Sequence, residues 1–303
     1  MTQSPGRLLA ASLEPLTMGA SPLGKRPEIG DALADALLSG RFHQIDTSNN
    51  YAHGNSERLL GEAIARLGGL PYDRRIFSKV DPDPETGVFD ADRVLRSFDE
   101  TKQRLGLDTL PLLHFHDPYG LTVAEAMAPG GPVEALARLR EEGAVGAIGI
   151  AAGTRALMEA YVRTDAFDAV LIHNRFTLVD RTADQVFTDA TERGMAVFNA
   201  APFGGGILAG SATRGVKYAY TEPSPEFLAY LERLRGAAAD SGVDLAAAAL
   251  QFAIGDPRVH TVVVGVSSIE RLQALDGLLD ARIPGEFWDA VRSLGTPPPS
   301  PAD

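Results

Sequence analysis

The chain has 303 residues, of which 45% are hydrophobic and 22% are charged. This balance is typical of a folded globular protein and excludes a disordered chain. The formal net charge of -12 at pH 7 argues against general binding to nucleic acid or anionic membranes. It still permits an anionic cofactor, because local basic groups and helix N-termini can hold phosphates. There is no cysteine, which excludes disulfides, thiolate catalysis and cysteine metal sites.

Residues 1–9 lack the apolar core of a signal peptide, and no apolar run is long enough to span a membrane. We therefore expect a cytoplasmic protein that has neither a membrane nor a nucleic acid as partner. A monomer or a small homo-oligomer is expected.

Residues 1–14 are expected to form a loose tail, and from there short β-rich strands alternate with helices. Strands are expected at residues 15–20, 43–47, 75–80, 110–116, 145–150, 169–173, 195–200 and 260–264. Helices are expected at residues 27–38, 56–67, 92–105, 132–142, 154–162, 183–193, 226–240, 245–254 and 268–279. The proline-rich residues 296–301 predict a disordered tail. Eight strand-helix units without an interdomain linker predict a single (β/α)8 TIM barrel with a core over about residues 15–290.

Ionisable side chains follow the ends of three successive expected strands, where a TIM barrel builds its active site. Asp46 ends the second strand, Lys79 the third and His116 the fourth. Tyr51 lies in the turn after the second strand, and a phenol with a pKa near 10 is a poor acid or base at neutral pH. A nearby ammonium lowers that pKa, and a carboxylate offsets the burial of the ammonium. The set predicts a proton donor and acceptor suited to hydride transfer, with a histidine that orients the substrate oxygen.

The ordered motifs resemble the aldo-keto reductase superfamily. They are D-T-x-x-x-Y at residues 46–51, S-K at 78–79 and H-D-P at 116–118. Further similar segments are G-E-A at 61–63, H-N-R-F-T at 173–177, A-P-F-G-G-G-I-L at 201–208 and V-G-V-S-S at 264–268. The resemblance covers almost the whole chain. It is most similar to the branch of sugar and pyridoxal dehydrogenases related to L-fucose or D-threo-aldose 1-dehydrogenase.

The resemblance implies an NAD(P)(H)-dependent enzyme that interconverts an aldehyde, ketone or sugar lactone and an alcohol or lactol. Tyr51 would be the general acid/base, Lys79 and Asp46 would tune it, and His116 would position the carbonyl. The implied cofactor-binding residues are Gly19, Ala20, Asp46, His173, Ala201, Pro202, Phe203, Gly205, Gly265, Ser267, Ser268 and Arg271. The small-molecule carbonyl or sugar substrate would contact Tyr51, His116 and Tyr119, with specificity from the loops at residues 119–131 and 211–225. NADP(H) is favoured and NAD(H) is possible.

The chain departs from the family pattern around the nicotinamide. The usual serine-asparagine pair after the fifth strand is Ala151-Ala152, and the usual glutamine of the sixth strand is His173. The stacking tyrosine after the seventh strand is matched by Ala200. Asp276, near the end of the phosphate segment, does not favour a nearby phosphate.

Two alternatives use the same residues. His114 and His116, with Lys79 and His173, suggest a metal-dependent barrel hydrolase, although barrel amidohydrolases place such a histidine pair on the first strand. In the reductase interpretation no metal is expected, and His114 is either a core residue or part of the substrate pocket. The departures around the nicotinamide also permit a non-catalytic, nicotinamide-binding redox sensor.

Overall fold

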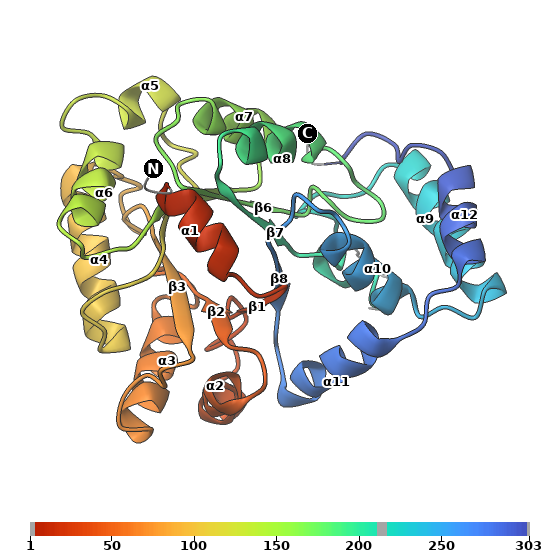
Figure 1. Ribbon diagram of the computed structural model, residues 1–303, viewed down its shortest axis with the longest axis horizontal. Helices are drawn as coiled ribbons and strands as arrows, with labels where there is room; N and C mark the ends of the chain where they lie inside the picture. The colour runs from red at the N-terminus through yellow and green to blue at the C-terminus, as the bar shows by residue number, and fades with distance from the viewer. Residues whose placement is uncertain (1–3, 211–216, 302–303) are drawn as a thin grey trace.

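The computed structural model of the protein describes residues 4–210 and 217–301. Eight parallel strands are hydrogen-bonded in chain order, and β8 pairs with β1, so the sheet closes into a barrel. Helices surround this barrel (Figure 1). The (β/α)8 architecture predicted from the strand-helix alternation is confirmed.

The strands are short and mostly buried, as expected for a parallel sheet covered by helices. They are β1 (Leu16–Gly19), β2 (Gln44–Asp46), β3 (Arg75–Val80), β4 (Leu113–His116), β5 (Ile148–Ala152), β6 (Ala169–His173), β7 (Ala196–Ala200) and β8 (Thr261–Gly265). β4 begins three residues later than expected, because Pro111 has no amide proton to donate to a ladder. Before it, Leu110 makes only an isolated bridge to Val145.

Most of the helices follow a strand and pack outside it. These are α2 (Gly30–Ser39), α3 (Asn55–Arg66), α4 (Ala91–Leu105), α6 (Pro132–Glu141), α7 (Arg155–Val162), α8 (Asp184–Glu192), α10 (Leu245–Ile254) and α11 (Ile269–Asp280). The additional elements are α1 (Pro5–Ser12), α5 (Val123–Ala126), α9 (Pro225–Asp240), α12 (Gly285–Ser293) and the 3-10 turns η1 (Pro27–Ile29) and η2 (Gly204–Gly206).

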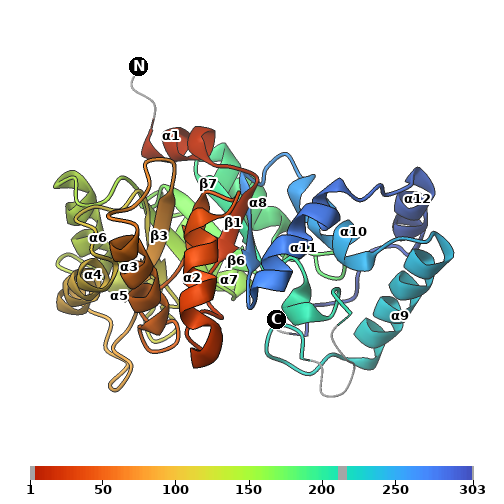
Figure 2. The ribbon, with the colours of Figure 1, turned by 90° about the horizontal axis from the view of Figure 1, so that it is seen from below.

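The segment before β1 is a helix, so the expected loose tail is wrong from residue 5 onward. Ser4 caps α1 by accepting a hydrogen bond from the Arg7 amide, and Pro5 occupies the first turn, where its missing amide costs nothing. Leu9 is buried in a cluster with interior residues of the barrel. α1 therefore covers the end of the barrel opposite the loops that follow the strands (Figure 2).

The C-terminal tail is also ordered as far as it is described. Ser300 is buried, and its hydroxyl accepts a hydrogen bond from Arg175, just after β6 (2.6 Å). The expectation of disorder considered only the prolines and missed this polar contact. The tail thereby returns from α12 to the mouth of the barrel.

α9 and α12 lie outside the ring of barrel helices and enclose a second apolar cluster (Figures 1 and 2). Tyr218, Phe227 and Phe287 are fully buried in it. Within residues 4–210 and 217–301, no single helix is long and apolar enough to cross a membrane. α9 and α10 would pass that test only together, and the chain bends by 104° between them.

Candidate active site

The strands open at their C-terminal ends into one cleft, which is where barrel enzymes carry their chemistry. It is lined by residues at or just after the ends of every strand except β3. Tyr51, His116 and Asp46 line the cleft from one side, and Lys79 lies fully buried beneath them. The structure thus brings together the four residues predicted from the strand ends.

Lys79 is the centre of this group. Its ammonium donates to Asp46 Oδ2 (2.6 Å), to the Thr47 carbonyl (2.6 Å) and to Tyr51 Oη (3.1 Å). These acceptors use the three protons of the ammonium. Burial acts to lower the pKa of Lys79, but Asp46 and Tyr51 outweigh it and raise the pKa. Lys79 is therefore charged at neutral pH.

The Tyr51 hydroxyl keeps its proton at neutral pH. Burial raises its pKa above the usual value of 10, and Lys79 lowers it only in part. The expected effect of Lys79 is thus present, but desolvation is larger. Because of this balance, the phenol is a proton donor until another charge or hydrogen bond stabilises its phenolate.

His116 is held by a carboxylate that the sequence reasoning missed. Its Nδ1 is 2.7 Å from Asp81 Oδ1 and 3.2 Å from the Ser48 hydroxyl, which itself donates to Asp81. Burial acts to lower the pKa of His116, but Asp81 outweighs it and raises the pKa. The signal in the sequence was the spacing, because Asp81 lies two residues after Lys79, just past the end of β3.

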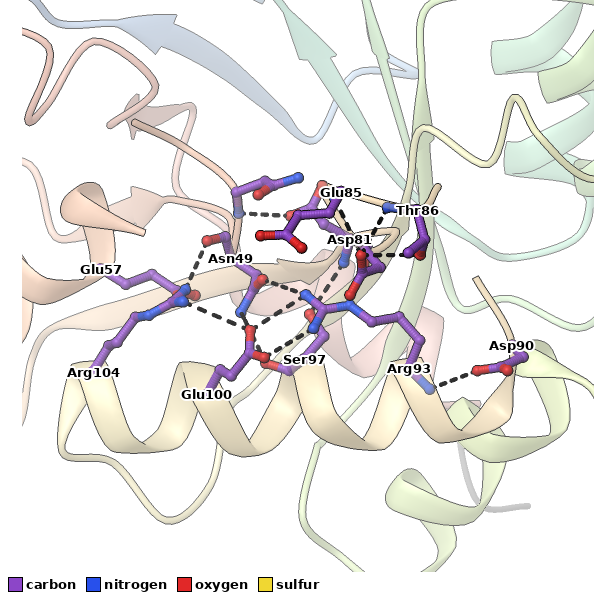
Figure 3. Close-up of polar contacts among 12 residues, drawn as sticks. Asn49, Glu57, Asp81, Glu85, Thr86, Asp90, Arg93, Ser97, Glu100 and Arg104 are labelled. Atoms are coloured by element: carbon purple, nitrogen blue, oxygen red, sulfur yellow. Dashed lines mark hydrogen bonds and ion pairs between the residues drawn. The ribbon is translucent and has the colours of Figure 1, made fainter. Parts of the chain in front are cut away.

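A buried polar network fixes the turn that carries Tyr51 (Figure 3). Arg93 on α4 donates to the Asp81 carbonyl (3.0 Å), to Asn49 Oδ1 (2.9 Å) and to Glu100 (2.8 Å). Arg104, one turn beyond Glu100, donates to the Asn49 carbonyl (2.7 Å). α4 therefore positions both the tyrosine turn and the carboxylate that holds His116.

The opposite side of the cleft is built from small apolar residues. Ala151, Ala152 and Ala200 line it where the family usually carries polar or aromatic contacts to the nicotinamide. Gly265 at the end of β8 faces open space, because a β-carbon there would meet no atom of the described chain within 4 Å. This side can therefore admit a flat ring and a dinucleotide chain.

Three acceptors at this mouth lack donors. Asp46 Oδ1, Asp117 Oδ1 and Asn174 Oδ1 are buried and have no hydrogen-bond partner in the described chain. An unpaired buried acceptor costs free energy. All three residues line the cleft, and their carboxylate and amide groups supply acceptors that suit a carboxamide or a hydroxylated substrate.

Asn174 is oriented by the preceding histidine. Its side-chain amide donates to His173 Nδ1 (3.0 Å), and its Oδ1 has no partner among the described residues. Burial lowers the pKa of His173 to about 4, so its ring is neutral and can accept. The backbone of Asn174 is left-handed (φ 58°), a conformation that residues other than glycine adopt rarely and that recurs at functional sites.

The N-terminus of α11 offers a place for a phosphate. Ser268 caps the helix by accepting from the Arg271 amide (3.3 Å), and Arg271 is exposed on the first turn. Asp276 lies five residues further along the helix and pairs with Arg41 (2.5 Å), so its charge is neutralised away from the helix start. Lys25, which the sequence reasoning did not select, lines the cleft from the β1–α2 loop.

The predicted cofactor residues divide into two groups. The cleft is lined by Gly19, Asp46, His173, Ala201 and Gly265. The remaining members are not among the residues that line it: Ala20, Pro202, Phe203, Gly205, Ser267, Ser268 and Arg271. Tyr119 lines an adjoining cleft that shares Asp117, His173 and Tyr220 with the first one. Of the two predicted specificity loops, residues 211–216 lie outside the described chain.

The histidine pair does not form a metal site. His114 is fully buried inside the barrel, and its ring packs edge-on against Phe198 (5.5 Å between centroids). Gly149 makes room for it, because a β-carbon there would lie 2.2 Å from His114 Nδ1. Burial holds the pKa of His114 well below its usual value. Within the ranges that the structure describes, no group of three or more histidine, aspartate or glutamate residues is placed to hold a metal. His114 is thus a core residue.

A closed barrel with a buried lysine between a carboxylate and a phenol defines a class of barrel oxidoreductases. The sequence profile of the Aldo/keto reductase family matches residues 15–296. The chain therefore belongs to the aldo/keto reductase family and is an oxidoreductase that acts on carbonyl compounds. Members of this family use nicotinamide cofactors. The metal-dependent hydrolase and the redox sensor are therefore not favoured.

Named relatives agree with this assignment. Pyridoxal 4-dehydrogenase of Microbacterium luteolum is 29% identical, over 92% of this chain and 93% of that protein. D-threo-aldose 1-dehydrogenase of Pseudomonas sp is 29% identical, over 85% of each chain. An aldo-keto reductase of Bacillus halodurans, solved in its holo form, has a TM-score of 0.75 and 21% identity, over 93% of this chain and 92% of that one. The expected resemblance to the sugar and pyridoxal dehydrogenase branch is confirmed.

Proposed function

We propose that this enzyme interconverts a small aldehyde, ketone or sugar lactone with the corresponding alcohol or lactol, with Tyr51 as general acid/base. The observation that carries the proposal is the position of the Lys79 ammonium, 3.1 Å from Tyr51 Oη and 2.6 Å from Asp46. The names of the pyridoxal and aldose dehydrogenase relatives support this substrate range.

In the reducing direction, Tyr51 gives its proton to the substrate oxygen. Its raised pKa keeps that proton in place until the oxygen gains negative charge. Lys79 then stabilises the phenolate, and Asp46 keeps the ammonium charged and aligned. In the oxidising direction the phenolate takes the proton back from the alcohol.

His116 orients the same oxygen. Asp81 and Ser48 engage Nδ1, which leaves Nε2 to donate a hydrogen bond toward the cleft. A donor fixed before the reaction stabilises charge that develops on the oxygen without any reorganisation. Tyr51 and His116 thus form a pair of donors, and their rings meet edge-on at 5.7 Å between centroids.

A nicotinamide dinucleotide would supply or accept the hydride when bound. Asn174 Oδ1 would accept from its carboxamide, in place of the missing serine-asparagine pair. The three alanines leave room for the ring, and the start of α11 with Ser267, Ser268 and Arg271 would hold the adenosine phosphate. Arg271 favours NADP(H), because its positive charge would pair with the additional phosphate, which NAD(H) lacks.

The test replaces Tyr51 by phenylalanine. Lys79 keeps two of its three acceptors in this variant, so the fold should survive. We expect turnover of aldehydes with NADPH and NADH to fall roughly 10²- to 10⁴-fold, while cofactor affinity measured by fluorescence quenching stays within about twofold of the wild-type value. Unchanged turnover would refute the role of Tyr51, and absence of cofactor binding by the wild type would refute the proposed function.

A further inference from the structure

One carboxylate at the cleft lies outside the network that holds Tyr51 and His116. Asp117 follows the last residue of β4 and adopts a left-handed backbone (φ 47°). Its amide donates to the Ala151 carbonyl (2.9 Å), which fixes the backbone between β4 and β5. A residue with a β-carbon adopts this conformation at a cost, and such strain collects at functional sites.

The Asp117 carboxylate lies next to the reacting groups. Oδ2 is 3.6 Å from His116 Nε2, the ring nitrogen that Asp81 leaves free. Oδ1 is buried and accepts no hydrogen bond from any residue that the structure describes. The side chain as a whole is 36% exposed and lines the cleft, so the carboxylate can accept from a donor on the substrate, and hydrogen bonds to a charged acceptor are among the stronger ones.

Two further residues with left-handed backbones line the adjoining cleft together with Asp117. Ala219 and Tyr220 both have positive φ values (47° and 71°), in a tight turn closed by two hydrogen bonds between Tyr218 and Thr221 (2.9 Å each). Turns of this geometry usually contain glycine or asparagine. Tyr218 anchors the turn, because it is buried and donates to the Asn174 carbonyl (2.7 Å). The turn thus holds the exposed Tyr220 at the rim.

The charge of Asp117 affects the pKa of both neighbouring tyrosines. Burial, and then Asp117, raise the pKa of Tyr119 to about 12 and also raise that of Tyr220. Tyr119 accepts from the Gly153 amide (2.9 Å), which keeps its hydroxyl beside the carboxylate. The adjoining cleft therefore presents one carboxylate and two phenols, together with the guanidinium of Arg175, and this set of acceptors and donors suits hydroxyl groups.

We propose that Asp117 binds a hydroxyl group on the carbon next to the reacting carbon. This inference rests on the proposed function, which places the reacting oxygen against Tyr51 and His116. Because Asp117 lies beside His116 Nε2, a hydroxyl bound to it belongs on the neighbouring carbon. The substrate is then a neutral 2-hydroxy aldehyde or ketone, or the sugar lactol that contains this unit.

The test compares two aldehydes that differ only in this hydroxyl, lactaldehyde and propionaldehyde. Wild-type enzyme should prefer lactaldehyde by roughly ten- to a hundredfold in kcat/KM, the range of one hydrogen bond to a charged acceptor. Asp117→Ala should bring this ratio close to one, mainly by lowering kcat/KM for lactaldehyde. Asp117→Asn, which keeps the shape and one acceptor without the charge, should fall between them.

Cofactor affinity and melting temperature of each variant show whether the fold and the cofactor site are intact. A ratio that stays the same in Asp117→Ala would overturn the inference and leave the proposed function standing. Absence of turnover of both aldehydes by the wild type, with either NADPH or NADH, would overturn the proposed function, and with it the inference.

Discussion

The two sides of the barrel mouth differ in how far the chain satisfies its own polar groups. On the side of β2 to β4, Lys79 has three acceptors, and the His116–Asp81 pair is braced by Ser48 and the backbone. On the side of β5 to β8, alanines line the cleft, and Asn174 has an acceptor without a donor within the described residues. The first side thus fixes its lysine and its histidine before any ligand binds, although Asp46 Oδ1 and Asp117 Oδ1 there also lack donors among the described residues. The second side has no comparable network of charged groups.

This difference separates two tasks. Groups that stabilise a developing charge work best when they are fixed in advance, because no reorganisation is then needed during the reaction. Groups that select a ligand gain affinity when the ligand satisfies an acceptor that is otherwise buried and unpaired. We therefore expect substitutions in the Lys79 and His116 networks to affect stability and turnover, and those on the second side and at Asp117, which joins β4 to β5, to affect binding and selectivity.

The largest effect on stability is expected from Asp46→Asn. Asp46 and Lys79 are almost completely buried and paired at 2.6 Å. Removal of the carboxylate leaves a buried ammonium without its counter-charge, which costs about 3–5 kcal/mol. The measurement is the free energy of unfolding in urea.

Glu62→Gln is the matched control for this variant. Glu62 pairs with Arg58 at the same distance, 2.6 Å, but on the exposed face of α3. An exposed pair contributes about 0–1 kcal/mol. Equal destabilisation by the two substitutions would show that burial does not make the Lys79–Asp46 pair more stabilising than an exposed pair.

A smaller, pH-dependent effect is expected from Asp81→Asn. Asp81 raises the pKa of His116 above 6.5, and His116 lowers that of Asp81 below 3.8. The stabilisation that arises from the raised pKa of His116 is fully present below pH 6.5 and is lost as the pH rises through that raised pKa. The aspartate contribution is present above pH 3.8 and is lost as the pH falls through the lowered pKa.

The difference in unfolding free energy between wild type and Asp81→Asn should thus be largest near pH 5–6, at about 1–3 kcal/mol, and smaller at pH 9. Urea unfolding at a series of pH values measures it. Asp276→Asn, which breaks an exposed pair with Arg41, should show less than about 1 kcal/mol. A loss in Asp81→Asn that does not change with pH would contradict a charged His116–Asp81 pair.

The contrast between the two sides also explains what the sequence could predict. Strand ends are readable from apolar periodicity, so residues at strand ends, such as Asp46, Lys79 and His116, could be placed together before any coordinates. Asp81 also lies just past a strand end, but it was missed because its role depends on a side chain that points toward His116, and strand position alone does not give that direction. Asn174 was not selected because His173, the residue before it, matches the family's glutamine by position.

The tails and the pKa of Tyr51 were harder to predict for another reason. Leu9 and Ser300 each depend on one long-range contact, which local composition does not reveal. The pKa of Tyr51 was expected to fall because Lys79 is near, and only the packed structure shows that desolvation is the larger effect. Local pattern thus specifies the barrel, whereas partner choice and burial emerge only when the elements are packed.

On the side of the alanines, Asn174→Ala should weaken the binding of both cofactors. Loss of one hydrogen bond between neutral groups corresponds to a roughly two- to tenfold rise in Kd. The rise should be equal for NADH and NADPH, because their carboxamides are identical. Fluorescence titration measures it, with the melting temperature as a check on the fold, and unchanged Kd values would exclude Asn174 as a carboxamide contact.

The smallest effect is expected from Arg271→Ala, at the edge of the same side. Arg271 is exposed, so its attraction to a phosphate is screened and is worth about 0.2–1 kcal/mol, or roughly a one-and-a-half- to fivefold rise in Kd for NADPH. NADH lacks the additional phosphate, and its Kd should stay the same. The preference of the wild type should also decrease as salt is raised, whereas that of the variant should not. Arg292→Ala, which removes an exposed arginine on α12, is the matched control. If Arg271→Ala weakens both cofactors equally, the residue only supports the start of α11, and the choice between NADP(H) and NAD(H) must come from another charge, such as Lys25, which lines the cleft.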